Sequence, residues 1–415
     1  MGSSLLLLMM LMGCEPRTEI GSPYGKLSEY ELVLDAAVQL GGPRNGTDGP
    51  SLLGVAGGLF IDSTTVAAAD PFNKDVRIFS VGGRYLRSLG RQGSGPGEYR
   101  GIGKVVRALP GEIAVWDTQL KRVTRFRVGD GSYTTIPVDI DDLHKMEFIG
   151  ALGDSGWVFR MMVPPQRPPP NDLWSEVWTG TQRFLRVAPG GTSVTTLTEV
   201  HGEERVSRAT VTSGVGGSVG LNTVIGPLFG TRILSGIDQT GLVTASSDSL
   251  SIQKWASDGS LLLQHSLPGR KGLAEEWIVE EVRASILDSI RSAPSDMVIT
   301  VGGLTLTSQS QAVKANEDRP SKARLPEFTR VIHSSDGFVW MEMFDPPSSP
   351  ARRWLRLDAR LRPEGTVLVP RSYGVLDFRD EMLLAVETDQ LGVEKLMVVP
   401  MRQAPKGTVE RAASR

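Results

Sequence analysis

Residues 69–79 read Ala69-Asp70-Pro71-Phe72-Asn73-Lys74-Asp75-Val76-Arg77-Ile78-Phe79, and a Gly82-Gly83 turn follows. This stretch joins an acidic residue, an apolar strand that ends in an aromatic side chain, and a turn. The same order recurs at Asp117, Val123, Phe126 and Gly129-Asp130, at Ser246, Ile252, Trp255 and Asp258-Gly259, and more loosely at Asp345, Trp354 and Asp358. Strands and turns that repeat on this scale predict a solenoid or a β-propeller.

The predicted strands add up to an all-β, six-bladed β-propeller over residues 29–402. Units of about four strands are predicted at 52–90, 102–137, 146–198, 228–268 and 326–369. The last unit, near 374–399, offers only three strands, whereas the alternating residues of 30–40 offer one spare strand. We therefore expect this N-terminal strand to complete the last blade from outside and to tie the two ends of the ring together.

One stretch has helical rather than strand periodicity. Acidic residues crowd its first half, Pro294 follows its end, and apolar side chains recur at helical spacing at Trp277, Ile278, Val282, Ile286 and Ile290. This predicts one α-helix over about 273–292 within an insertion of about 270–324, whose remainder is a polar loop. Two interpretations stay open for the helix, which is either a packed cover over the core edge or a lid over a binding surface.

The N-terminal residues have the features of an export signal. Residues 1–13 carry no charge and include an apolar run that is too short to span a bilayer but fits a signal peptide. Leu11-Met12-Gly13-Cys14 resembles a bacterial lipobox, which implies a signal peptide over 1–13, lipidation of Cys14 and a lipidated tether over 14–28. Glu15 is compatible with the outer membrane, so a lipid-anchored location in the cell envelope, at the outer membrane or facing the periplasm, is expected. Residues 403–415 are predicted to be a disordered tail.

The repeats resemble a known group of proteins. Residues 69–79 resemble the core of an NHL-type propeller repeat, and residues 85–99 resemble the segment that joins blades in bacterial six-bladed β-propeller lipoproteins of the NHL-like or TolB-like kind. The run from Leu325-Pro326 through Trp340, Trp354 and Gly392-Val393-Glu394 is similar to the same group. The resemblance implies a fold rather than one function, because the group includes proteins of uncharacterised function, binding scaffolds, and metal-dependent lyases and hydrolases that act at the channel mouth.

A metal-dependent enzyme of this kind needs histidine or carboxylate ligands that converge on one channel. The four histidines occur about once per unit but at different places within their units, at His144, His201, His265 and His333. We therefore expect them to form no shared site.

The carboxylates give two interpretations. Asp70, Asp117 and Asp345 occupy equivalent turn positions, with Ser246 in the fourth unit, and either hydrogen bonding within the turn or a calcium or catalytic role would explain them. A small acidic loop, with Asp139, Asp141 and Asp142, lacks the Gly and the distal Glu of an EF-hand loop. The sequence assigns no catalytic residue, no metal ligand and no cofactor, and nothing in it supports Ca²⁺ or Zn²⁺.

The tryptophans and the charge balance bear on the partner. Four tryptophans on predicted strands are expected in the core: Trp116, Trp255, Trp340 and Trp354. Trp174 and Trp178 follow the Pro-rich loop at 163–170, and exposed aromatics of this kind anchor peptides or glycans.

The chain has 45 basic and 47 acidic residues and no basic stripe, which argues against a nucleic-acid partner.

We expect a monomeric, non-catalytic binding or scaffolding propeller whose partner is a protein, a peptide or a glycan. The alternative is a metal-dependent lyase or hydrolase that acts at the channel mouth. The two differ in whether polar side chains from three or more blades converge on the channel and hold a divalent metal ion.

Overall fold

The computed structural model describes residues 27–41, 52–163, 175–214, 217–238, 240–248, 250–269, 272–292, 298–301, 304–389 and 393–404. Cys14, Trp174, the predicted signal peptide and nearly all of the predicted tether and tail lie outside these residues. Among the helices of this described part, none is long and apolar enough to cross a membrane.

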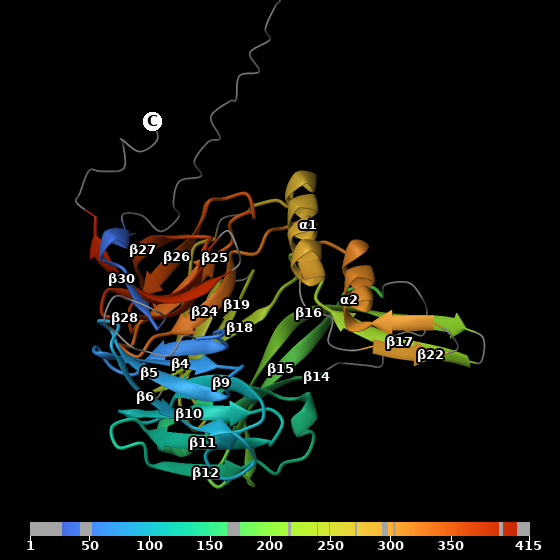
Figure 1. Ribbon diagram of the computed structural model, residues 1–415. Helices are drawn as coiled ribbons and strands as arrows, with labels where there is room; N and C mark the ends of the chain where they lie inside the picture. The colour runs from blue at the N-terminus through green and yellow to red at the C-terminus, as the bar shows by residue number, and fades with distance from the viewer. Residues whose placement is uncertain are drawn as a thin grey trace, which may run out of the picture.

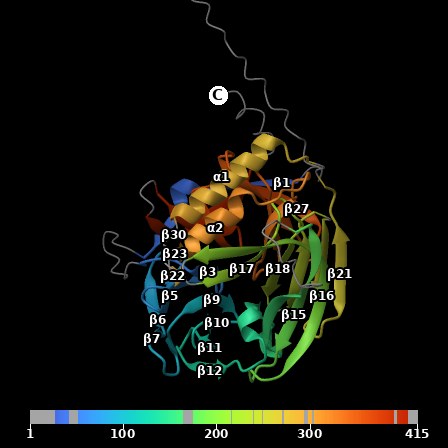
Figure 2. The same ribbon diagram turned by 90° about the vertical axis from the view of Figure 1, so that its right-hand side faces the viewer.

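The described chain is mainly β and has a propeller-like arrangement with two α-helices (Figures 1 and 2). In Figure 2 the sheets follow one another around a centre in chain order. Three sheets have four antiparallel strands each. The first contains β3 (Gly57–Phe60), β4 (Thr65–Asp70), β5 (Asp75–Ser80) and β6 (Tyr85–Leu89), and the second contains β9 (Ile102–Arg107), β10 (Glu112–Asp117), β11 (Arg122–Arg127) and β12 (Tyr133–Pro137). The third contains β18 (Ile233–Asp238), β19 (Gly241–Ser246), β20 (Ser251–Trp255) and β21 (Leu261–Ser266).

A fourth sheet extends beyond its predicted end. Its strands are β13 (Glu147–Ala151), β14 (Trp157–Val163), β15 (Trp178–Val187), β16 (Val194–Gly214) and β17 (Gly217–Ile225). The third unit was predicted to end near residue 198, whereas β16 continues to Gly214 and pairs with β17 as a long hairpin. The predicted boundary was wrong because β16 continues through Gly202, Glu203 and Glu204, residues that ordinarily disfavour strands, and pairs first with β15 and then with β17.

Nine further strands form one sheet, and two short two-stranded sheets, β7 (Arg91–Gln92) with β8 (Glu98–Tyr99) and a hairpin in the insertion, complete the described strands. The nine-stranded sheet contains β24 (Phe328–His333), β25 (Val339–Met343), β26 (Ala351–Leu357), β27 (Pro363–Pro370), β28 (Tyr373–Arg379), β29 (Met382–Thr388) and β30 (Glu394–Gln403), together with β1 (Ser28–Leu32) and β2 (Val38–Leu40). Strand β1 pairs in parallel with β27 and antiparallel with β30, and so joins the last two predicted units. The predicted pairing of the N-terminal strand with the C-terminal unit is confirmed.

The N-terminal segment differs from its prediction in one respect, because it forms two strands rather than one. A 3₁₀ turn at Leu34–Ala36 separates β1 from β2, and both strands pair with β30. At the break, the Val33 N–H donates to the carbonyl of Pro400 at 2.8 Å. Pro400 has no N–H to donate in return, so the ladder is weakened at this point and the chain bulges outward.

Asp70 and Asp117 stabilise turns, as one of the two interpretations predicted, whereas Asp345 accepts from the Arg353 N–H on β26 at 2.9 Å. The Asp70 carboxylate accepts hydrogen bonds from the backbone N–H groups of Leu53, Phe72 and Asn73. Asp117 accepts four equivalent backbone bonds, and both carboxylates are fully buried. Burial alone would raise the pKa of Asp70, but these hydrogen bonds outweigh it and hold the pKa below its usual range.

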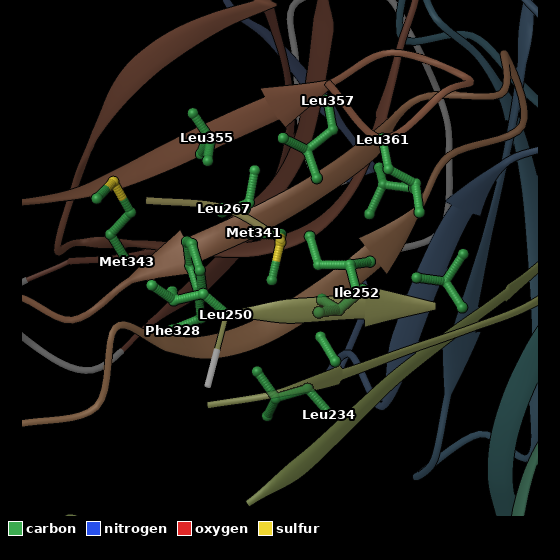
Figure 3. Close-up of a cluster of buried hydrophobic side chains, with 14 residues drawn as sticks. Leu234, Leu250, Ile252, Leu267, Phe328, Met341, Met343, Leu355, Leu357 and Leu361 are labelled. Carbon is green, nitrogen blue, oxygen red and sulfur yellow. The ribbon is translucent and has the colours of Figure 1, made fainter. Parts of the chain in front are cut away.

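The core lies between neighbouring sheets. Figure 3 shows one cluster in which side chains of β18 and β20 meet those of β24, β25 and β26, among them Leu234, Ile252, Phe328, Met341 and Leu355. Trp116, Trp340 and Trp354 are buried as predicted. Trp255 is only half-buried, contrary to its prediction, because its indole N–H donates to Thr244 Oγ1 at the wall of a polar groove.

The insertion contains more structure than predicted. Helix α1 (Glu276–Ser292) confirms the predicted helix, but a hairpin of β22 (Val298–Val301) and β23 (Leu304–Thr307) and a second helix, α2 (Ser308–Glu317), replace the predicted polar loop. The Arg283 guanidinium on α1 donates to the carbonyls of Asn316, Glu317 and Arg319 at the end of α2. In Figure 1 the helices, β17 and β22 lie to one side of the sheets, and Figure 2 views the molecule from that side.

Candidate ligand site at the axial cavity

One cavity of about 340 Å³ is lined by the first strand of each four- or five-stranded sheet and of both halves of the nine-stranded sheet. These strands are β3, β9, β13, β18, β24 and β28. They contact one another in turn from β28 through β3, β9, β13 and β18 to β24, and the Arg330 guanidinium closes the circle by donating to the carbonyl of Val375 on β28 at 2.7 Å. We call this space the axial cavity.

A buried ion pair crosses the axial cavity near the ends of the lining strands. Arg107 Nη1 on β9 lies 2.5 Å from Asp377 Oδ2 on β28, and Arg107 Nη2 donates to the carbonyl of His333 on β24 at 2.7 Å. The Phe60 N–H on β3 donates to the same Asp377 oxygen at 2.9 Å. Burial raises the pKa of Asp377, and the Arg107 guanidinium acts in the opposite direction. These contacts bind four lining strands together and bound the cavity at this end.

Other basic side chains gather away from this pair. Lys104 and Arg330 are the third residues of β9 and β24, Arg232 directly precedes β18, and each is followed by an apolar pair, as is Glu147 at the start of β13. Arg160 on β14 lies opposite Glu147 and pairs with it at 2.7 Å. We call this part of the cavity, with Lys104, Glu147, Arg160, Arg232 and Arg330, the basic mouth.

The charges of the basic mouth repel one another. Burial lowers the pKa of Lys104, Glu147 raises it, and Arg160 and Arg330 lower it further. Arg330 is exposed as a whole residue, but burial of its guanidinium lowers its pKa, Glu342 raises it, Arg352 lowers it and Asp377 raises it. Among the described residues, the Lys104 amine and the Arg232 guanidinium make no hydrogen bond or ion pair.

The insertion flanks the basic mouth. Arg319, which follows α2, donates through Nε to the Gly226 carbonyl at 2.6 Å. Burial lowers the pKa of Arg319 to about 10, and the nearby guanidinium groups of Arg232, Arg205 and Arg283 act in the same direction. The insertion that carries α1 and α2 therefore lies on the side of Arg232.

The histidines do not come together. His144 and His201 are exposed, His265 is half-buried on β21, and His333 is buried at the wall of the axial cavity. In the described part of the chain, no group of three or more His, Cys, Asp or Glu side chains lies close enough to hold a metal ion. This part includes the acidic loop, where Asp142 pairs with Lys145 at 2.8 Å.

Trp178 is not among the residues that line the axial cavity. It begins β15, is half-buried, and pairs across the strands with Arg205 on β16. Burial lowers the pKa of Arg205, Glu203 raises it, and Arg232 and Arg160 lower it further. Trp174, its predicted companion, lies outside the described residues.

Sequence reasoning missed the basic mouth, although a signal for it exists. Lys104-Val105-Val106, Arg232-Ile233-Leu234 and Arg330-Val331-Ile332 show the same pattern, one basic residue before two apolar residues. In the structure the basic residue of each triplet lines the axial cavity. Alignment of the units on these triplets would have singled out the three cations.

Comparison with known proteins shows similarity of fold only. No family model and no curated protein matches the chain. A putative exported protein from Bacteroides fragilis is 10% identical, with 91% of this chain and 96% of that chain covered and a TM-score of 0.42. A member of the DUF4221 family from Bacteroides vulgatus is 11% identical, with 91% and 100% covered and a TM-score of 0.46. Virginiamycin B lyase from Staphylococcus aureus is 12% identical, with 90% and 99% covered and a TM-score of 0.34.

Proposed function

We propose that the protein is a non-catalytic binding module, a six-bladed β-propeller whose ligand enters the axial cavity through the basic mouth. The blade count is supported by the lining strands β3, β9, β13, β18, β24 and β28. The nine-stranded sheet counts as two blades, because β1 pairs with the outer strand of each half and joins them.

The shape of the axial cavity is the observation that carries this proposal. A cavity of about 340 Å³ is at the lower end of the range typical of small-molecule sites. The Arg107–Asp377 pair bounds it at one end, whereas charged side chains line the other. Because rigid strands of several sheets position these side chains, the site is organised before a ligand arrives.

The substitution Thr329→Trp tests the location of the site. Thr329 lies on β24 at the wall of the axial cavity and is exposed, so an indole there is expected to fill the mouth without disturbing the core. Thr134→Trp, at an exposed position on the outer strand β12, is the matched control. A ligand found by a thermal-shift screen of the full chain is expected to stabilise the wild type and the Thr134→Trp variant but not Thr329→Trp.

The fate of the ligand separates the proposed function from its alternative, a metal-dependent lyase or hydrolase. A ligand recovered unchanged by mass spectrometry after incubation supports a binding module. Conversion to a product that stops when EDTA is added would favour the enzyme. Ligand binding that survives Thr329→Trp but is weakened by Trp178→Ala would show that the site lies at Trp178 rather than in the cavity.

We also propose that the propeller is anchored in the cell envelope through lipidated Cys14. The support is the lipobox-like Leu11-Met12-Gly13-Cys14 at the end of an apolar run. The Cys14→Ser variant is expected to move from the membrane pellet to the soluble fraction when expressed in a Gram-negative bacterium. An unchanged pellet fraction, with no labelling of the wild type by a clickable fatty acid, would contradict the anchor.

A further inference from the structure

The charges around the axial cavity do not balance. Five cations and two carboxylates line it, the carboxylates being Glu147 and Asp377. Asp377 pairs with Arg107, and Glu147 pairs with Arg160. Three cations form no salt bridge among the described residues: Lys104, Arg232 and Arg330. Glu147 still raises the pKa of Lys104, and Glu342 and Asp377 raise that of Arg330.

These three cations all line the axial cavity. Lys104 and Arg330 are each the third residue of their strands, β9 and β24, whereas Arg232 directly precedes β18. Because they line one cavity of about 340 Å³, they lie near one another. Arg330 is fixed in place, since its Nη1 donates to the Val375 carbonyl at 2.7 Å.

Three neighbouring cations destabilise the folded protein unless an anion offsets their repulsion. Like charges in surroundings of reduced dielectric repel more strongly than they do in water. Burial lowers the pKa of Lys104, and Arg330 lowers it further, against the opposing effect of Glu147. Burial also lowers the pKa of Arg330, while Glu342 and Asp377 act in the opposite direction. Guanidinium and ammonium groups that converge in this way are the donors that proteins use for carboxylate and phosphate oxygens.

We propose that the basic mouth binds a small multivalent oxyanion, a molecule with two or more carboxylate or phosphate groups, through Lys104, Arg232 and Arg330. This inference rests on the proposed function, since it assigns a ligand class to the same cavity. The volume of about 340 Å³ suits a small molecule rather than a folded partner. Three unpaired cations match an anion of charge −2 to −3.

Calorimetric titration of the full chain tests the proposal, with citrate as the carboxylate probe and pyrophosphate as the phosphate probe. At least one of them is expected to bind with one-to-one stoichiometry, and acetate and sorbitol are expected not to bind. Lys104→Gln and Arg330→Gln are each expected to weaken binding at least tenfold. Arg84→Gln, at an exposed arginine on the β5–β6 turn, is the matched control and should leave binding unchanged.

Two further readouts guard against loss of folding. Without anion, the Lys104→Gln variant is expected to melt at or above the wild-type temperature, because it removes a repelled charge. Anion binding by the wild type should weaken as pH rises above neutrality, since Lys104, facing Glu147, Arg160 and Arg330, loses its proton at a lower pH than an ordinary lysine. The Lys104→Gln variant should lack most of this pH dependence.

The outcomes separate this inference from the proposed function. Binding of citrate alone or of pyrophosphate alone supports the inference and identifies the group. Binding that is equal in wild type, Lys104→Gln and Arg330→Gln, or that lacks a one-to-one endpoint, overturns it as non-specific ion association. If neither probe binds while another ligand binds and is blocked by Thr329→Trp, the oxyanion inference fails and the binding module stands.

Discussion

The Asp377→Leu variant is expected to lose about 3–5 kcal/mol of the free energy of unfolding, because the change leaves the Arg107 guanidinium buried without its carboxylate. The Asp377 side chain is 3% exposed and that of Arg107 is 10% exposed, so water does little to replace the lost partner. The same carboxylate also accepts the Phe60 N–H, which would lose its acceptor. Urea unfolding at pH 7, followed by tryptophan fluorescence, measures the change.

Two controls show whether the loss comes from the unpaired charge. The double variant Arg107→Met with Asp377→Leu removes both charges and is expected to recover much of the lost stability, because an apolar pair of similar volume can replace a buried ion pair. Glu199→Gln breaks the half-exposed Arg183–Glu199 pair and should cost no more than about 1 kcal/mol. A double variant less stable than Asp377→Leu would show that the loss does not come from the unpaired Arg107 charge.

Removal of the N-terminal strands is expected to have the second large effect. A chain that begins at residue 27 keeps β1 and β2 and should melt at the temperature of the full chain. A chain that begins at residue 42 lacks both strands, which exposes the edges of β27 and β30 and removes buried Leu40 from the core. The loss of Leu40 alone is worth about 2–5 kcal/mol by analogy with core truncations. We expect a broad, low melting transition and association of the exposed edges.

Circular dichroism melting and size-exclusion chromatography of the two truncated chains measure this effect. Tyr30→Ala is the milder companion variant, because Tyr30 accepts a hydrogen bond from Arg356 Nη1 at 2.9 Å and packs against Gly365. Its melting temperature is expected to fall between those of the two truncated chains. Equal melting temperatures for the chains that begin at 27 and 42 would show that the pairing of β1 and β2 with β27 and β30 contributes little to stability.

The fold was largely predictable from local sequence because its repeats depend on local chemistry. Asp70 and Asp117 accept hydrogen bonds from backbone N–H groups of the turns that directly follow them. Because these contacts join residues close in sequence, a repeated local spacing is enough to predict them. Helix α1 was predictable for the same reason, from its own periodicity and end signals. The pairing of the N-terminal segment with the C-terminal unit followed from counting strands.

The parts that were missed depend on contacts that are distant in sequence. Helix α2 has little apolar periodicity, and its end is stabilised by Arg283 from another helix. The break between β1 and β2 lies opposite Pro400, hundreds of residues away in the chain. The Arg107–Asp377 pair likewise joins residues 270 positions apart, so no local pattern announces it.

The candidate site was missed for a different reason. A metal site was expected to consist of histidine and carboxylate ligands, whereas the residues that line the cavity together are Lys104, Arg232 and Arg330. The overall composition does not show this local excess of positive charge, because acidic residues elsewhere bring the net charge to −2. Only the register of the first strands places the three cations around one cavity.

A crystal structure of the full chain grown with saturating citrate or pyrophosphate tests the central claim most directly. The account predicts anion density in the axial cavity, within hydrogen-bonding distance of Lys104, Arg232 and Arg330. An empty basic mouth at saturating anion, or density only at surface sites elsewhere, would contradict it.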